Sequence, residues 1–317
     1  MKFPASQTLL AAALLPISLM LLTGCSSAPV TGNAQPSTLV TISATDIPEI
    51  SITGQEIPAK KRVVALANGS AEIIYAMGFK TILVGRDVAS TMPALSTIPV
   101  VTSGHQIIPE KIISLNPDAV LIDASSGPSS AIDSLKSSAQ SLTLISEAWT
   151  LADIAKKITA IGSAIGAPKS AAALIRSLNT TVTDSKIRRI PAPKIAFLYL
   201  RGTSSIFLMG GPGSGADSLI QAIGAVDVGA LTLPHPFNSL TSEALVRADP
   251  DVILVMTKGM ESVGGLKGLL ALPGVAQTSA GINKRVIAVD DSLLLSFGPR
   301  TPGLIGELAR SLMKVMM

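Results

Sequence analysis

Residues that could bind a metal or form a disulfide are scarce in this chain of 317 residues, which has one Cys, two His, two Tyr and one Trp. A lone cysteine, Cys25, excludes an intramolecular disulfide and a cluster held by several thiolates. No HExxH motif and no Asp-rich calcium loop is present, so we expect no zinc or calcium cage built from protein ligands alone. The formal net charge is only +4, and no basic run with interleaved aromatics occurs, which argues against a nucleic-acid partner.

Signatures of catalysis are missing as well. The sequence has no Gly-x-Ser-x-Gly elbow, and neither His105 nor His235 has an acidic residue beside it that could orient the imidazole. We therefore expect a binding protein and not an enzyme.

The N-terminus has the features of a secretion signal. Lys2 supplies a positive start, and an apolar stretch follows that is short for a membrane span of about 20 residues. The stretch ends in Leu-Thr-Gly-Cys25, which resembles a bacterial lipoprotein cleavage box. The resemblance implies removal of residues 1–24 and lipid attachment at Cys25. Residues 25–58 are rich in Ser, Thr, Pro, Ala and Gly and predict a flexible tether, which would hold the body outside the cytoplasm at the cell membrane.

Two distant segments share a pattern. Glu110 precedes a Pro-Asp pair by the same seven positions as Glu243, and an apolar run that predicts a buried parallel strand follows each pair. The matching residues are 133 positions apart, and they lie in the segments 108–122 and 240–254. This period is too long for a solenoid repeat and predicts two similar lobes with a ligand-binding cleft between them.

Strands and helices alternate on either side of a long helical stretch. The alternation predicts an α/β fold with two Rossmann-like lobes and mostly parallel sheets, at residues 59–166 and 191–317. Residues 167–190 lack Gly and Pro after Pro168 and carry apolar residues at helical spacing. We expect one long helix to join the lobes, and we expect a monomer.

The few available ligands suit a molecule that brings most of its own coordination sphere, such as haem, for which a protein supplies one or two axial atoms. His105 follows a strand-like segment in the first lobe, and Tyr199 lies near the end of the second lobe's first strand, where open α/β sheets bind ligands. Arg201 would point to the same side as Tyr199 and favour its phenolate form. A solvated loop histidine and a core tyrosine are the simpler interpretations. His235 is the reserve ligand, and Tyr75 is expected to pack in the core.

The lobe–helix–lobe layout, the paired Glu-to-Pro-Asp segments and residues 85–93 (Gly-Arg-Asp-Val-Ala-Ser-Thr-Met-Pro) resemble the substrate-binding proteins of ABC importers for iron chelates, cobalamin and haem. This resemblance implies the class III periplasmic-binding-protein fold. Gly104-His105 and Tyr199-x-Arg201 are similar to the haemin-binding lipoproteins of Gram-positive, particularly actinobacterial, importers. That likeness implies that His105 and Tyr199 hold the haem iron from opposite lobes, with Arg201 bonded to the tyrosine.

The same resemblance implies delivery of haem to an ABC permease. Glu110 and Glu243 would dock onto basic sockets of the permease, although an acidic residue in a first helical turn also complements the helix dipole. Arg86 and Arg300 could reach the haem propionates, with surface salt bridges as the equal alternative. A ferric siderophore or cobalamin stays open as the alternative ligand.

Overall fold

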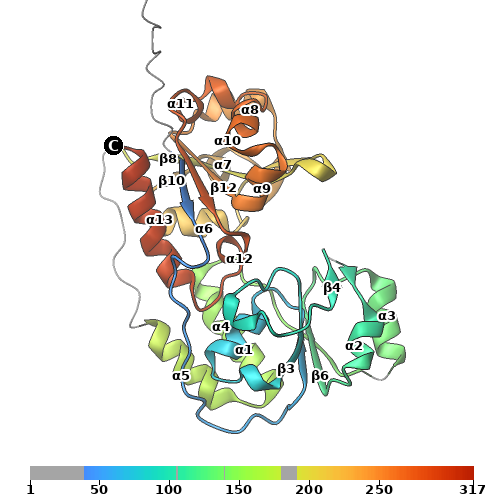
Figure 1. Cartoon of the computed structure of the whole chain (residues 1–317). Coiled ribbons are helices and arrows are strands. Elements are labelled where there is room, and N and C mark those ends of the chain that lie inside the picture. Colours follow the sequence, from blue (N-terminus) through green and yellow to red (C-terminus); the bar gives the residue numbers. More distant parts are fainter. Residues whose placement is uncertain (1–38, 105, 139, 180–190) are drawn as a thin grey trace, which may run out of the picture. The chain divides into compact units, whose positions relative to one another are not determined.

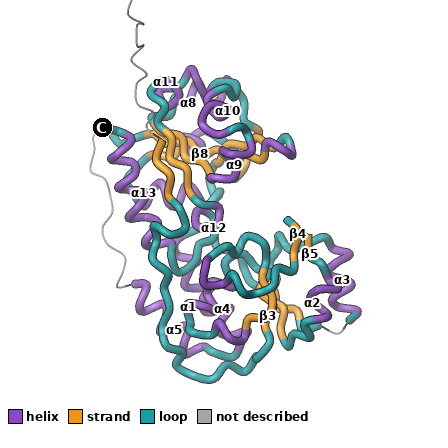
Figure 2. The backbone as a smooth tube through the Cα atoms, in the orientation of Figure 1, coloured by secondary structure: helices purple, strands orange, loops and turns teal. Residues whose placement is uncertain are grey.

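The computed structural model describes residues 39–104, 106–138, 140–179 and 191–317, and these contain two main sheets (Figures 1 and 2). The N-terminal sheet has four strands, all parallel, in the order β3 (Leu83–Arg86), β2 (Val63–Ala65), β6 (Ala119–Ile122) and β7 (Leu142–Leu144). Its helices are α1 (Ser70–Ala76), α2 (Pro109–Ser114), α3 (Ser129–Ser137) and α4 (Leu151–Ile165). A separate hairpin joins β4 (Thr102–Ser103) to β5 (Gln106–Ile107).

Both faces of the N-terminal sheet are buried because helices cover each side. Side chains alternate between the faces of a strand, so Val64 and Val120 pack in one cluster with Ile112 of α2 and Leu135 of α3. Their strand neighbours Val63, Ala65, Ala119 and Leu121 belong to a second cluster with α1 and α4. Burial on both faces of the sheet explains the continuous apolar runs, which predicted buried parallel strands.

The C-terminal sheet has seven strands. Its path is β1 (Leu39–Ile42), β13 (Val286–Val289), β12 (Val252–Met256), β8 (Lys194–Arg201), β9 (Ile206–Gly210) and β11 (Phe237–Ser239), with β10 (Val226–Asp227) also paired to β8. The antiparallel pairs are β8 with β9 and β9 with β11, and the other pairs are parallel. The helices are α6 (Ala216–Ala222), α7 (Val228–Thr232), α8 (Ser242–Ala248), α9 (Thr257–Ser262), α10 (Gly265–Leu270), α11 (Ser279–Ile282), α12 (Asp291–Leu294) and α13 (Thr301–Val315). The predicted α/β architecture with two mostly parallel sheets is confirmed.

One apolar core extends through both lobes. Phe197 and Leu254 of the C-terminal sheet and Leu308 of α13 belong to the same cluster of buried residues as Ile73 of α1 and Ile158 of α4. The other face of the C-terminal sheet packs in its own cluster with α8, α9 and α10. Burial of this shared core favours a fixed arrangement of the lobes.

The duplicated segments adopt matching local structures. Each forms a short helix, α2 or α8, and then a residue with positive φ, Asn116 at 43° or Asp249 at 38°, immediately before the proline. The left-handed residue ends the helix, and the proline prevents its continuation. In each copy, the aspartate after the proline accepts a backbone N–H at the start of a strand in the same lobe. The donor is Lys61, two residues before β2, in one lobe and Lys194, the first residue of β8, in the other. These bonds join Lys61 N to Asp118 Oδ2 at 2.7 Å and Lys194 N to Asp251 Oδ2 at 2.8 Å.

The structure corrects the predicted tether. Residues 39–42 form strand β1, which pairs with β13 in parallel, so the described part of the 25–58 segment belongs to the folded body. The expected linker helix begins as α5 (Pro168–Asn179), and residues 180–190 lie outside the described residues. In the part of the chain that is described, no helix has the length and apolar character needed to cross a bilayer.

Candidate functional site

Tyr199 lies near the carboxyl end of β8 between an aromatic ring and a cation. Its half-buried ring meets Phe237 of β11 edge-on, with centroids 5.6 Å apart and an interplanar angle of 69°. The guanidinium carbon of Arg201 lies 4.6 Å from the Tyr199 ring centroid. The two-residue spacing on a strand therefore puts Tyr199 and Arg201 on one side of the sheet.

Arg201 is held in this position by protein contacts. Its Nη1 donates to the carbonyl of Leu200 at 2.8 Å, and its Nη2 lies 3.2 Å from Asp291 Oδ1. The other oxygen of Asp291 accepts the backbone N–H of Lys258 at 3.0 Å. Because both ends of the carboxylate are bonded, Asp291 fixes the guanidinium over the aromatic face, where a cation is attracted to the π electrons.

Two cavities meet at Tyr199. One has a volume of about 370 Å³ and the other about 500 Å³, which fits the range of about 300–1,000 Å³ for small-molecule sites. Four residues line both cavities, two from each lobe: Asn68, Ser125, Tyr199 and Leu295.

Both cavities combine apolar and charged groups. The smaller one has apolar and aromatic walls, formed by Ala67, Ile145, Ala148, Trp149, Leu208 and Phe237, and the charged residues Asp123, Glu147 and Lys157 also line it. The larger one includes the charged residues Asp87, Arg201, Lys258 and Asp291, and Gly104 also lines it. The pair of cavities therefore suits a ligand with a broad apolar body and polar or charged edges.

A buried lysine lies at the wall of the smaller cavity. Lys157 is 4% exposed, and its ammonium donates to the carbonyl of Ser296 at 2.8 Å. Burial lowers the pKa of Lys157 to about 8, and nearby carboxylates, foremost Asp123, oppose this shift. Asp123 itself accepts hydrogen bonds from the backbone of Asn68 and from two serines.

Comparison with known proteins gives the family. The model of a family described as periplasmic binding protein matches residues 63–293. The chain belongs to that family. Its members are binding components of transport and not enzymes, which confirms the expected absence of catalysis.

Three relatives show how far the likeness extends. A protein of Bacillus subtilis (strain 168) named uncharacterized ABC transporter substrate-binding lipoprotein YvrC is 29% identical over 269 residues, covering 82% of this chain and 83% of the relative. The periplasmic haem-binding protein RhuT from Roseiflexus sp. RS-1 superposes with a TM-score of 0.75 at 32% identity, covering 82% of this chain and all of RhuT. The haem-binding protein HmuT superposes with a TM-score of 0.73 at 31% identity, covering 86% of this chain and 96% of HmuT.

The predicted axial ligands can be placed only in part. Tyr199 lines both cavities of this periplasmic binding protein, whereas His105 lies outside the described residues. Gly104, which precedes His105 in sequence, lines the larger cavity together with Tyr199. The reserve ligand His235 is exposed and is not among the residues lining either cavity.

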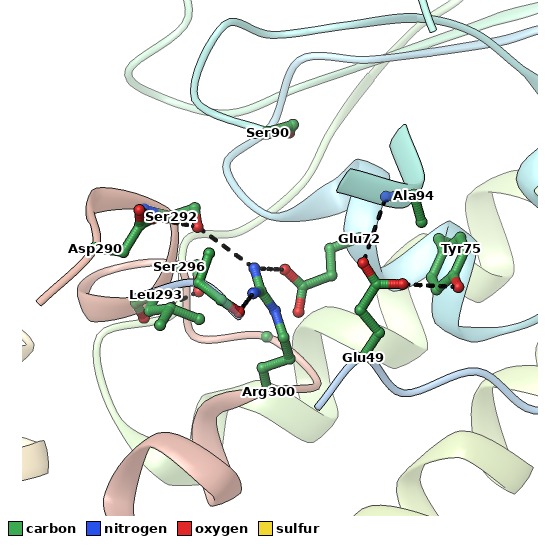
Figure 3. Close-up of polar contacts among 12 residues, drawn as sticks. Glu49, Glu72, Tyr75, Ser90, Ala94, Asp290, Ser292, Leu293, Ser296 and Arg300 are labelled. Atoms are coloured by element: carbon green, nitrogen blue, oxygen red, sulfur yellow. Dashed lines mark hydrogen bonds and ion pairs between the residues drawn. The ribbon is translucent and has the colours of Figure 1, made fainter. Parts of the chain in front are cut away.

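The two arginines predicted to reach the propionates, Arg86 and Arg300, have partners within the protein. Arg300 is 2% exposed, forms an ion pair with Glu72 at 2.8 Å (Figure 3), and is not among the residues lining either cavity. Arg86 donates through Nε to the carbonyls of Leu95 and Ile98 and through Nη1 to that of Ser90. Both guanidinium groups are thus bound by the protein itself and do not face the cavities.

The positions of three other predicted residues can be described. Glu110 and Glu243 are exposed in the first turns of α2 and α8. Tyr75 packs against the core, and its hydroxyl donates to Glu49 at 3.1 Å (Figure 3). Cys25 lies outside the described residues.

Several residues that line the smaller cavity belong to no motif from which the sequence could have predicted their place. Trp149, Phe237 and Lys157 come from segments without a motif, and the topology of the sheets alone brings them to the cavities. The only trace of Phe237 is its place after Pro236 in a loop-like stretch. The described residues also contain no cluster of three or more His, Cys, Asp and Glu side chains able to hold a metal ion.

Proposed function

We propose that the chain is an extracytoplasmic haemin-binding lipoprotein that captures haem between its lobes for an ABC import permease. The observation that carries this proposal is Tyr199 at the junction of two cavities, with Arg201 fixed over its ring. A phenolate oxygen is a suitable axial ligand for ferric haem. The cation beside the ring supports the negative charge of that ligand.

The similarity to HmuT supports the same residues. That haem-binding protein was also solved with an arginine, a histidine and a tyrosine each changed to alanine, and its tyrosine lies two positions before its arginine. Tyr199 and Arg201 have the same spacing, and His105 precedes Tyr199 by about as many positions as the HmuT histidine precedes its tyrosine. We therefore assign His105 and Tyr199 as the two axial ligands and Arg201 as their support.

The remaining surfaces of the cavities fit the rest of haem. Aromatic and aliphatic side chains such as Trp149 and Phe237 can cover the porphyrin, whose burial supplies most of the affinity. Lys258 is exposed and lines the larger cavity. It is the cation that a propionate can reach, in place of Arg86 and Arg300.

Attachment and delivery complete the proposal. Lipid on Cys25 would hold the protein at the cell membrane, as the name of the B. subtilis lipoprotein suggests for that relative. Glu110 and Glu243, one on each lobe, would dock onto basic groups of the permease. Exposed charges of this kind mainly set orientation and the rate of encounter.

Haemin titration tests the assignment. We expect a stoichiometric complex with a Soret band, and we expect both His105→Ala and Tyr199→Phe to shift that band. Trp149 is the only tryptophan of the chain and lines a cavity, so haemin should also quench its emission. Tyr75→Phe is the matched control, because its hydroxyl bonds to Glu49 and not to a cavity.

Each other outcome has a defined meaning. An unchanged Soret band in both ligand variants would refute the axial assignment. Quenching of Trp149 by a ferric siderophore or by cobalamin, without haemin binding, would favour the alternative ligands of the same fold. No quenching by any of the three would refute ligand capture at this site.

A further inference from the structure

The exposed side of the duplicated segment carries a second shared feature. Ile113 and Val246 lie three residues after Glu110 and Glu243 in helices α2 and α8, and they are 37% and 42% exposed. Residues three apart are neighbours on a helix surface. Each lobe therefore presents a carboxylate beside a β-branched aliphatic side chain.

The buried residues that hold α2 and α8 to their sheets are neighbours of these two side chains. Ile112 and Leu245, the residues just before them, are fully buried and already anchor each helix to its sheet. β-branched residues are weak helix formers, so an exposed one adds little to a helix of six or seven residues. Ten large hydrophobic side chains of the described residues are exposed, and two of them, Ile113 and Val246, occupy equivalent positions 133 residues apart.

We propose that Ile113 and Val246 are apolar contacts of the docking surface for the ABC permease, each packing beside the group that receives Glu110 or Glu243. This inference rests on the proposed function and adds the part of the surface that supplies affinity. The matching pairs fit a partner that presents the same receiving surface twice, with a cation for the carboxylate and an apolar patch for the aliphatic group. Burial of apolar surface strengthens association, whereas the charges steer it.

The charge on α8 is available to such a partner. Glu243 lies 3.8 Å from Arg247, and the two side chains are 87% and 71% exposed. Surface pairs of this kind contribute little stability. A permease cation can therefore replace Arg247 as the partner of Glu243 without a large loss.

Binding to the permease tests the inference. The affinity of the haemin-loaded protein for the ABC permease of its own source cell would be measured by biolayer interferometry. The permease would be reconstituted with its ATPase subunits in nanodiscs. We expect Ile113→Ser and Val246→Ser each to weaken binding about tenfold, since burying one aliphatic side chain contributes on this order. Met313→Ser is the control, because Met313 is 46% exposed on α13, outside the repeat. Haemin affinity should stay unchanged in all three variants.

Salt dependence separates the two kinds of contact. Glu110→Gln and Glu243→Gln should reduce the dependence of affinity on ionic strength, whereas the serine variants should weaken binding and keep that dependence. If the serine variants bind like the wild type while the glutamine variants bind weakly, the inference is wrong and the docking role of the glutamates stands. If the wild-type protein does not bind the permease, the proposed delivery function fails together with the inference. Permease binding without haemin binding would overturn only the choice of ligand.

Discussion

The ion pair between Arg300 and Glu72 joins the two lobes in the interior of the protein (Figure 3). Arg300 precedes α13, Glu72 lies on α1, and their side chains are 2% and 9% exposed. Arg300 also donates to the carbonyl of Ala44 at 3.1 Å and to Ser292 Oγ at 3.4 Å. We expect Arg300→Met, which keeps much of the volume and removes the charge, to destabilise the protein strongly.

The magnitude follows from burial. At 2.8 Å, the attraction between the charges is about 6 kcal/mol for an effective dielectric constant of about 20, but desolvation of both groups offsets much of this in the intact protein. The variant retains the desolvation penalty of the Glu72 carboxylate and loses its partner. Loss of one partner from a buried pair costs about 3–5 kcal/mol. We expect a decrease of about 4 kcal/mol in the free energy of unfolding, within that range.

Urea unfolding measures this change. Trp149 emission and far-ultraviolet circular dichroism should give coincident transitions, from which the free energy is extrapolated. The double variant Glu72→Gln with Arg300→Met should recover part of the loss, because no buried charge then lacks a partner. Lys136→Met is the control: its ion pair with Asp133 is 3.8 Å long with side chains 64% and 72% exposed, and its removal should cost less than about 1 kcal/mol.

Two results would refute this reasoning. One is a decrease of less than about 1 kcal/mol for Arg300→Met, which would equal the effect of a surface pair. The other is a double variant that is less stable than Arg300→Met alone. Either result would mean that the carboxylate of Glu72 reaches water or another cation when Arg300 is absent.

Three further predictions concern single residues. Burial lowers the pKa of Lys157 from 10.5 to about 8, so the unfolded chain binds more protons than the folded chain between these two pH values. The contribution of Lys157 to the free energy of unfolding should therefore increase as the pH rises from about 8 to 10.5, by up to about 3 kcal/mol. Lys157→Met should remove that part of the pH profile, and an unchanged profile would contradict the assignment. Gly229→Ala should destabilise by about 3 kcal/mol or more, since the new Cβ would lie 1.8 Å from the carbonyl oxygen of Gly210; a wild-type melting temperature would show that α7 shifts freely. Asp291→Asn weakens the hold on Arg201, and it should shift the haemin Soret band and lower affinity about tenfold, the effect of about 1.4 kcal/mol.

Local rules were enough to predict part of the site. Tyr199 and Arg201 lie two residues apart on one strand, so the alternation of side chains places them on the same side whatever surrounds the strand. The distance of 4.6 Å from the guanidinium carbon to the ring centroid agrees with that expectation. The repeated glutamate and Pro-Asp pattern likewise predicted two similar lobes, because it encodes a helix stop followed by a buried strand in each.

Contacts between distant segments could not be predicted in this way. Asp291 positions Arg201 from 90 residues further along the chain. Arginine is a residue type usually found on the surface, and Arg300 becomes buried because Glu72, 228 residues earlier, supplies a carboxylate. Strand β1 was expected to be tether for the same reason: its backbone hydrogen bonds come from β13, at the other end of the chain.

The loop before α13 both lines the cavities and bonds to the N-terminal lobe. Leu295 lines both cavities, and its carbonyl accepts the Asn68 side chain at 3.0 Å. The next carbonyl accepts Lys157, and Arg300 at the end of the loop pairs with Glu72. All three of these partners belong to the N-terminal lobe, so any motion that separates the lobes at this loop must break these polar bonds, two of which are buried, and expose the shared core. Capture therefore requires small movements around the cavity walls, whereas release of the ligand by separation of the lobes requires free energy from the binding partner.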